Sequence, residues 1–202
     1  MTIAQFWFDP ICPWTYVTYQ WLAEVRAERA VAIRPKLLSL LFLNEGRPDE
    51  RHAARHAASL PLERFLALVR AERGDAAMEQ AYQTLATALF VDSLEPDAAL
   101  ITKTADAVGI DPIEAAAAAE DPIWDAIIRH DHDAAMALVG ADVGSPVIAL
   151  EDGPAFFGPV LARAPRGQEA GRVWDGCRAL AAHPDFFELK RSRGARATIR
   201  FD

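Results

Sequence analysis

The chain has 202 residues, of which 51% are hydrophobic and 25% charged, and its formal net charge is -8. This size fits one compact unit with a large core, and the sequence contains no run of the roughly 20 apolar residues that a membrane span needs. The acidic excess argues against a broad nucleic-acid surface, which depends on clustered Lys and Arg. The first residues carry no cluster of positive charge, so we expect a soluble, cytoplasmic protein that binds neither nucleic acid nor membranes.

The first elements surround a cysteine. Residues 3–8 (IAQFWF) alternate and predict a buried strand, and from residue 13 onward apolar residues recur at helical spacing to about residue 29. Cys12 therefore lies directly before a helix, with Pro13 in the first turn, where the missing N–H of proline costs nothing. Residues 31–42 (VAIRPKLLSLLF) predict a second strand, in which Pro35 indicates a sheet edge or a bulge.

A long helical segment follows. Almost everything between residues 49 and 139 has helical spacing, after a loop at residues 44–49. Two Asp-Pro pairs, at residues 111–112 and 121–122, place a capping side chain directly ahead of proline. Each pair predicts the start of a helix.

The β pattern returns late in the chain. Residues 145–150 (SPVIAL) and 155–158 (AFFG) predict a hairpin with a tight turn at residues 151–153, and residues 168–182 predict a final helix. The order of strand, cysteine, helix, strand, helical segment, hairpin and helix implies a parallel crossover followed by antiparallel strands. This is an α/β fold on the thioredoxin plan with a large all-helical insertion.

The same order predicts the domain boundaries. We assign residues 1–45 and 140–202 to a thioredoxin-like domain and residues 46–139 to a helical insertion, or lid, domain.

Cys12 is the main candidate for chemistry. A thiolate is the reactive form of cysteine, and the N–H groups and positive dipole end of a helix stabilise it, so we predict a lowered pKa for Cys12. The alternative is that Cys12 is a buried small hydrophobe.

Thr15, three residues later, can donate a hydrogen bond to the thiolate but cannot form a disulfide, which disfavours a dithiol oxidant. A single thiol can still form a mixed disulfide and pass it to a second thiol. Cys177 lies on an apolar helix face with Leu180, and we expect it to be structural.

Ser145-Pro146 is the second half of the proposed site. A proline that opens a strand suggests a special peptide bond, and a cis bond would turn the backbone of Ser145 toward Cys12, where it could pair with an extended ligand. Trp14 starts the helix and is the aromatic residue that we place against a ligand ring. The other aromatic residues near the motif are expected to be mostly core: Trp7, Tyr16 and Trp21.

Other polar clusters are weaker candidates. Residues 130–133 (HDHD) suggest a metal site, but positions two apart on a helix face different directions, so we expect no metal there. His52 and His56 share a helix face that is either solvated or gates substrate entry. The basic residues within 190–200 are expected to form a solvated tail, with anion binding as the alternative.

Several segments in combination resemble the DsbA-like branch of the thioredoxin superfamily, and most closely the actinobacterial mycothiol-dependent nitroreductases. They are FWFDPICPWTYVTYQWL, LSLLFLNEGRPD, DVGSPVIAL, FFGPVLARAPRGQEAGRVWDG and FFELKRSR. The resemblance implies a thioredoxin fold with a helical lid, a cytoplasmic setting, often a dimer, and reduction of substrates with mycothiol as electron donor.

The resemblance also implies roles for individual residues. Cys12 corresponds to the attacking cysteine of the family, Pro13 and Trp14 to its Pro-Trp pair, and Pro146 to its cis-proline. Thr15 departs from the family pattern, because CPWT stands where the family has CPWC. The departure leaves a monothiol route, in which mycothiol itself would resolve the adduct on Cys12.

The sequence thus predicts a thiol-dependent oxidoreductase. Its attacking cysteine would form a mixed disulfide with a small thiol, with mycothiol as co-substrate and no permanently bound cofactor, and it would reduce disulfide, electrophilic or nitro substrates. A homodimer is a further expectation. The predicted catalytic residues are Cys12, Pro13, Trp14 and Thr15, and the predicted substrate-binding residues are Ser145, Pro146 and Trp14. Two alternatives stay open: a kappa-class-like glutathione transferase or isomerase that activates a bound thiol, and a thiol-binding protein without turnover.

Overall fold

The computed structural model describes residues 1–46, 52–150 and 153–199. In these residues four strands form one mixed sheet in the order β2-β1-β3-β4. The strands are β1 (Thr2–Phe8), β2 (Val31–Leu37), β3 (Val147–Leu150) and β4 (Ala155–Phe157). β1 pairs in parallel with β2 and antiparallel with β3, and β3 pairs antiparallel with β4. The predicted crossover and hairpin are confirmed, although residues 151–152 of the predicted turn lie outside the described part.

Alternation along β1 places its side chains in two cores. Ala4, Phe6 and Phe8 are buried in the main hydrophobic core, whereas Trp7 lies in a second cluster with Ala135 of α7 (Asp125–Val139). The Trp7 Nε1–H also donates to a backbone carbonyl of α7, that of Asp131, at 2.9 Å. Period-2 alternation thus lets a central strand bind helices on both faces of the sheet.

The second strand is shorter than predicted. β2 ends at Leu37, and Ser39 begins the short helix α2 (Leu40–Leu43), where its hydroxyl accepts from the Phe42 N–H at 3.4 Å. The apolar run LLSLLF lacks a β-breaking residue, but serine caps helices well, and that local preference turns the chain. Pro35 lies in an edge strand, as expected, where a missing N–H removes no second ladder bond.

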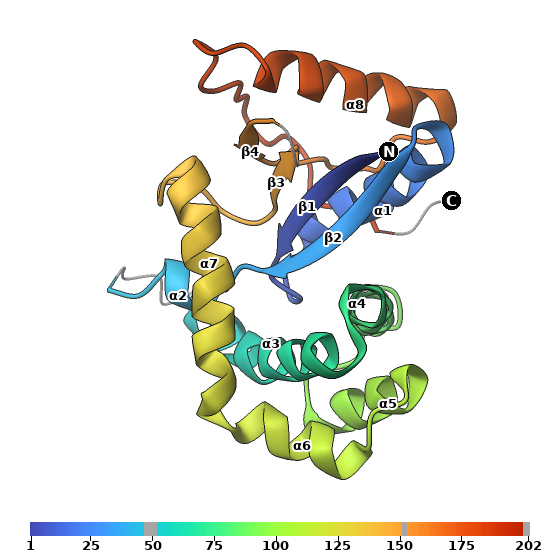
Figure 1. Cartoon of the computed structure of the whole chain (residues 1–202), viewed down its shortest axis with the longest axis vertical. Helices are drawn as coiled ribbons and strands as arrows, with labels where there is room; N and C mark the ends of the chain where they lie inside the picture. Colours follow the sequence, from blue (N-terminus) through green and yellow to red (C-terminus); the bar gives the residue numbers. More distant parts are fainter. Residues whose placement is uncertain (47–51, 151–152, 200–202) are drawn as a thin grey trace.

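After α2, the helices α3 (Ala53–Arg73), α4 (Asp75–Phe90), α5 (Ala98–Val108) and α6 (Pro112–Glu120) lie below the strands in Figure 1. The 3₁₀ turn Pro122–Trp124 leads into α7, which runs back up beside the sheet. Asp111 caps α6 as predicted, whereas Asp121 caps the 3₁₀ turn instead of an α-helix. The main core is continuous from β1 through these helices, and a separate domain with the predicted bounds stays a prediction.

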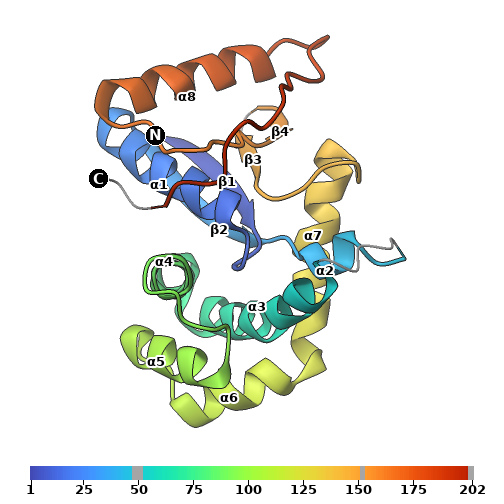
Figure 2. The same cartoon turned by 180° about the vertical axis from the view of Figure 1, so that it is seen from behind.

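Two more segments cover α1 (Pro13–Glu28), the helix that follows Cys12. The final helix, α8 (Gly167–Ala181), packs on α1, with the rings of Trp21 and Trp174 6.0 Å apart between centroids. Beyond α8 the chain folds back toward α1, and the Thr198 N–H donates to the Ala162 carbonyl at 2.6 Å (Figure 2). Within the described residues, every helix is too short or too polar to cross a bilayer.

Candidate functional site

Cys12 occupies the N-cap position of α1, at the end of a tight turn that follows β1. The Cys12 N–H donates to the Asp9 carbonyl at 3.1 Å, and the Ile11 N–H donates to Asp9 Oδ1 at 3.0 Å. Pro13 starts the helix, as predicted. Because the turn is packed into the fold, only 7% of the Cys12 surface is exposed.

The Ser145–Pro146 peptide bond is cis, and Ser145 faces Cys12. Cys12 Sγ lies 3.7 Å from the Ser145 carbonyl oxygen, to which the thiol can donate. Ser145 Oγ accepts from the Asp9 N–H at 3.1 Å and lies 2.7 Å from Thr15 Oγ1. The predicted cis geometry and the predicted orientation of Ser145 are therefore confirmed, and one serine connects β3, the turn and the first turn of α1. The binding and catalytic roles of these residues stay predictions.

The predicted lowering of the Cys12 pKa is wrong. Burial raises the pKa of the Cys12 thiol, and the nearby Asp9 carboxyl raises it further. The Thr15 hydroxyl and the N–H groups of Thr15 and Trp14 lower the pKa, as expected at a helix N-terminus, but burial outweighs them. The sequence signal was local, whereas the loss of water around the sulfur comes from packing of the whole chain.

Beneath the turn lies a pair of fully buried carboxyl groups, Asp9 and Glu63 of α3. Asp9 Oδ1 accepts from the Ser59 hydroxyl at 2.6 Å and from the Ile11 N–H, and Oδ2 accepts from the Leu40 N–H at 2.8 Å. Ser59 Oγ also lies 3.3 Å from Glu63 Oε1. Burial, followed by the charge of Asp9, raises the pKa of Glu63 well above its ordinary value. Asp9 has the donors that suit a carboxylate, so Glu63 is the group that holds the proton.

The sequence analysis missed this pair. Its signal was present in α3, where Ser59 and Glu63 lie four residues apart on a face that is otherwise apolar. A second signal was Asp9, which directly follows the apolar residues of β1. Polar residues on a buried face need partners, and here they are partners of one another.

Two arginines from distant segments contact residues on either side of Cys12. Arg55 of α3 donates from Nη2 to the Ile11 carbonyl at 2.8 Å. Arg193, beyond α8, places its guanidinium carbon 5.3 Å from the centroid of the Trp14 ring. The ring that we expected against a ligand is therefore half-buried and contacts an arginine of the same chain. Arg55 was not singled out from the sequence, whereas Arg193 belongs to the basic segment 190–200, for which anion binding was the alternative to a solvated tail.

Cys177 has a different environment. It lies half-buried on α8 and packs against the main core. Burial raises the pKa of the Cys177 thiol to about 11, with no other cause. Packing in the core agrees with the structural role that we expected, and its part in any reaction stays untested.

The histidine segment is not arranged as a metal site. Asp131 is buried and accepts from the Leu37 N–H at 3.0 Å, and it forms ion pairs with Arg70 and Lys36. The His132 ring packs edge-on against Phe42, 6.0 Å between centroids. No group of three metal-ligating side chains occurs in the part of the chain that the structure describes. His52 and His56 stack on each other, with ring centroids 5.9 Å apart.

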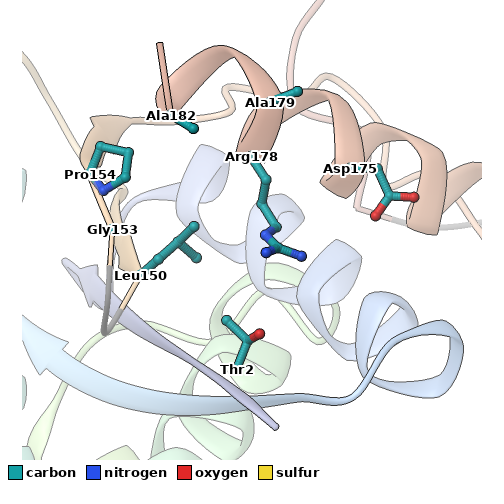
Figure 3. A pocket seen from close by; sticks show the side chains of 8 residues that line it. All are labelled: Thr2, Leu150, Gly153, Pro154, Asp175, Arg178, Ala179 and Ala182. Atoms are coloured by element: carbon teal, nitrogen blue, oxygen red, sulfur yellow. The ribbon is translucent and has the colours of Figure 1, made fainter. Parts of the chain in front are cut away.

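A pocket of about 480 Å³ lies between α8 and the sheet (Figure 3). Thr2, Leu150 and Arg178 line it, and the side chain of Arg178 extends from α8 toward the sheet. Thr2 starts β1, whereas Cys12 follows its end. A strand rises about 3.3 Å per residue, which separates the pocket from Cys12 by roughly 20 Å. The pocket is therefore not part of the Cys12 site.

Comparisons with known proteins give one family. Residues 11–191 match the family model described as Rv2466c-like, mycothiol-dependent nitroreductase Rv2466c. The uncharacterized protein Rv2286c of Mycobacterium tuberculosis is 31% identical over 198 residues, which cover 96% of this chain and 83% of that protein.

Solved structures share the fold at lower identity. A probable DsbA oxidoreductase from Streptomyces coelicolor has a TM-score of 0.62 at 19% identity, covering 96% of this chain and 95% of that chain. The cytosolic disulfide reductase DsbM of Pseudomonas aeruginosa, in a structure with GSH, has a TM-score of 0.57 at 18% identity, covering 88% and 100%. A 2-hydroxychromene-2-carboxylate isomerase has a TM-score of 0.62 at 16% identity, covering 88% and 93%. The predicted DsbA-like thioredoxin fold is confirmed.

Proposed function

Since the chain belongs to the mycothiol-dependent nitroreductase Rv2466c family, an oxidoreductase family, we propose that it reduces its substrates through a single thiol, Cys12. Mycothiol is the proposed electron donor. The observation that carries the proposal is the position of Cys12 Sγ, 3.7 Å from the carbonyl of the residue before a cis-proline and at the start of a helix.

The proposed reaction is thiol–disulfide exchange in three steps. In the first, the Cys12 thiol loses its proton to solvent, and its sulfur attacks one sulfur of a disulfide. A new bond forms between Cys12 and that sulfur, and the other half leaves as a thiolate. In the second step a mycothiol thiolate attacks the substrate sulfur of the mixed disulfide, which frees Cys12 and leaves mycothiol bonded to that half of the substrate. A second mycothiol then cleaves this bond, so that two mycothiols become one mycothiol disulfide and the substrate gains the two electrons that they lose.

Four neighbours support these steps. Ser145 presents its carbonyl oxygen beside Cys12. A backbone N–H of an extended ligand could donate to this oxygen in place of the thiol. Thr15 lowers the pKa of Cys12 through its hydroxyl, and Ser145 Oγ holds Thr15 in place at 2.7 Å. Pro13 and Trp14 fix the start of the helix, whose N–H groups face the sulfur of the thiolate.

The second thiol must come from outside the chain. Thr15 occupies the position of a resolving cysteine and cannot form a disulfide. Cys177 lies on α8, on the far side of α1 from the helical layer. We therefore infer that a free small thiol resolves the adduct. Disulfide substrates fit this cycle directly, and electrophilic or nitro substrates are extensions of it. A cytoplasmic location and a homodimer stay predictions.

One observation favours a second function. Because burial raises the pKa of Cys12, its protonated thiol could act as a donor to the thiolate of a bound small molecule. That is the arrangement of the kappa-class-like transferase or isomerase that the sequence left open. In that function Cys12 orients the small thiol and never bonds to it.

Intact mass spectrometry distinguishes the two functions. The protein and its Cys12→Ser and Cys177→Ser variants would be incubated at pH 7 and 9 with the disulfides of mycothiol and of glutathione. The proposal predicts one adduct that requires Cys12, forms without Cys177, forms faster at pH 9 and is removed by free thiol. A folded protein that binds the small thiol but forms no adduct at either pH would support the transferase function and contradict the proposal.

A further inference from the structure

Positive charge is concentrated beside Cys12, although the chain as a whole carries a formal net charge of -8. Arg55 binds the Ile11 carbonyl at 2.8 Å, and the Arg193 guanidinium carbon lies 5.3 Å from the centroid of the Trp14 ring. Ile11 and Trp14 lie one and two residues from Cys12. Two segments separated by more than a hundred residues thus each bring one cation to a residue that is close to Cys12 in the sequence.

Among the described residues, neither cation has a partner carboxylate. In residues 1–46, 52–150 and 153–199, no ion pair joins Arg55 or Arg193 to an Asp or Glu. Asp9 lies below the turn, and its oxygens accept from the Ile11 and Leu40 N–H groups and from the Ser59 hydroxyl inside the protein. Asp9 is fully buried, so it cannot contact a molecule that approaches Cys12 from solvent.

Both arginines keep hydrogen-bonding capacity for a ligand. A guanidinium has five N–H donors, and Arg55 uses one of its two Nη groups on the Ile11 carbonyl. Arg193 lies over an aromatic face, which is a cation–π contact that leaves the N–H edge of the guanidinium available. Both side chains belong to exposed residues.

We propose that Arg55 and Arg193 select negatively charged substrates, with a carboxylate or similar anion close to the bond that Cys12 attacks. This inference rests on the proposed function and names the substrate class of the same site. The two cations would raise the local concentration of an anionic disulfide and would stabilise the thiolate that leaves when the disulfide is cleaved. Since the Debye length is about 8 Å at physiological ionic strength, the attraction between these exposed cations and an anionic substrate should be weakened by added salt.

The test compares two aromatic disulfides in a Cys177→Ser background, so that Cys12 is the thiol measured. One probe, 5,5′-dithiobis(2-nitrobenzoate), carries two carboxylates, and the other, 4,4′-dithiodipyridine, is uncharged at pH 8. In each case Cys12 bonds to one half of the probe and releases the other half as a coloured thiol. Stopped-flow absorbance gives both second-order rate constants.

We expect Arg193→Gln and Arg55→Gln each to lower the rate constant of the dicarboxylate by about three-fold, the size of one partly exposed charge interaction, and the double variant by about ten-fold. The rate constant of the uncharged probe should stay within about two-fold, and Arg193→Lys should retain most of the dicarboxylate rate. Lys103→Gln removes a cation from α5, far from the sheet in Figure 1, and is the matched control.

The outcomes separate this inference from the proposed function. Equal losses with both probes, or losses equal to those of Lys103→Gln, would overturn the selection of anions while leaving Cys12 reactive. The arginine variants should lose more of the dicarboxylate rate constant than of the uncharged-probe rate constant. If this larger loss persists at about 0.5 M salt, the inference is also overturned, because that salt screens exposed charges. If neither probe reacts with Cys12 in the folded protein, the proposed function itself fails.

Discussion

Cys12 is buried and Cys177 is half-buried, and burial raises the pKa of both thiols, yet their surroundings differ. Burial is the only cause at Cys177. At Cys12 the Thr15 hydroxyl and two helix N–H groups oppose it, and a carbonyl lies 3.7 Å from the sulfur. If Cys12 is the reactive thiol that we propose and Cys177 is structural, burial alone does not distinguish the two. The distinguishing feature is the set of groups that can stabilise the thiolate once it forms.

The pH dependence of alkylation is the strongest test of this comparison. A raised pKa means that little thiolate exists at neutral pH, so both cysteines should react slowly with iodoacetamide at pH 7. In the Cys12→Ser variant, the rate at Cys177 should rise about ten-fold per pH unit and level off only near pH 11, since burial raises the pKa of Cys177 to about 11. In the Cys177→Ser variant, Cys12 should also level off above the ordinary pKa of a thiol. A plateau below pH 8 at Cys12 would contradict the comparison.

Thr15→Val sharpens the comparison by removing the hydroxyl that Cys177 lacks. Valine has nearly the same shape as threonine, and Ser145 Oγ keeps its bond from the Asp9 N–H. Because Thr15 lowers the pKa of Cys12, its loss should raise that pKa and slow alkylation at pH 8 by about five-fold, the equivalent of one hydrogen bond of about 1 kcal/mol.

Thr18→Val is the matched control for this change. Thr18 is also fully buried in α1, but its hydroxyl donates to the Trp14 and Pro159 carbonyls instead of the sulfur. Thr18→Val should destabilise the fold while leaving the alkylation rate of Cys12 within two-fold. An equal slowing in both variants would mean that Thr15 acts only through packing.

Glu63→Gln tests the buried carboxyl pair, which has no counterpart among the groups that act on Cys177. The pKa of Glu63 is raised in the folded protein, so the folded state holds a proton that the unfolded chain releases above about pH 4.5. Wild-type stability therefore falls as pH rises from that value through the folded pKa, whereas glutamine has no such loss. The free energy of unfolding of the variant should exceed that of wild type by about 1 kcal/mol at pH 7 and by less at pH 5.

Urea unfolding at both pH values measures this difference. Glu188→Gln, which changes an exposed carboxyl beyond α8, is the control and should alter stability by less than about 0.5 kcal/mol. A Glu63→Gln variant that is less stable than wild type at pH 7 would show that Glu63 is ionised in the fold and that its charge stabilises the turn.

The parts of the fold that the sequence predicted correctly depend on neighbours along the chain. The strand before Cys12, the proline that starts α1 and the hairpin after Pro146 all have local signals, and the structure confirms them. The end of β2 was missed because one capping serine, Ser39, outweighs an apolar run.

The parts of the site that the sequence did not predict depend on distant residues. Ser59 meets Asp9 across 50 positions, and Ser145 meets Asp9 and Thr15 across 136 and 130 positions. Arg193 reaches Trp14 only because the chain returns beyond α8. The direction of the Cys12 pKa was wrong for the same reason, since desolvation is the sum of all packing around the sulfur.

The contacts of Ser145 have a consequence for the order of events during folding. Its hydroxyl joins the Asp9 N–H and Thr15 across most of the chain length, and contacts of such long sequence separation require the closure of a large loop. The turn and helix around Cys12 can form from local interactions, whereas the contacts of Ser145 require the long segment between Thr15 and Ser145 to be closed into a loop. We therefore expect a chain in which this loop is still open to carry a more exposed Cys12 thiol than the folded protein.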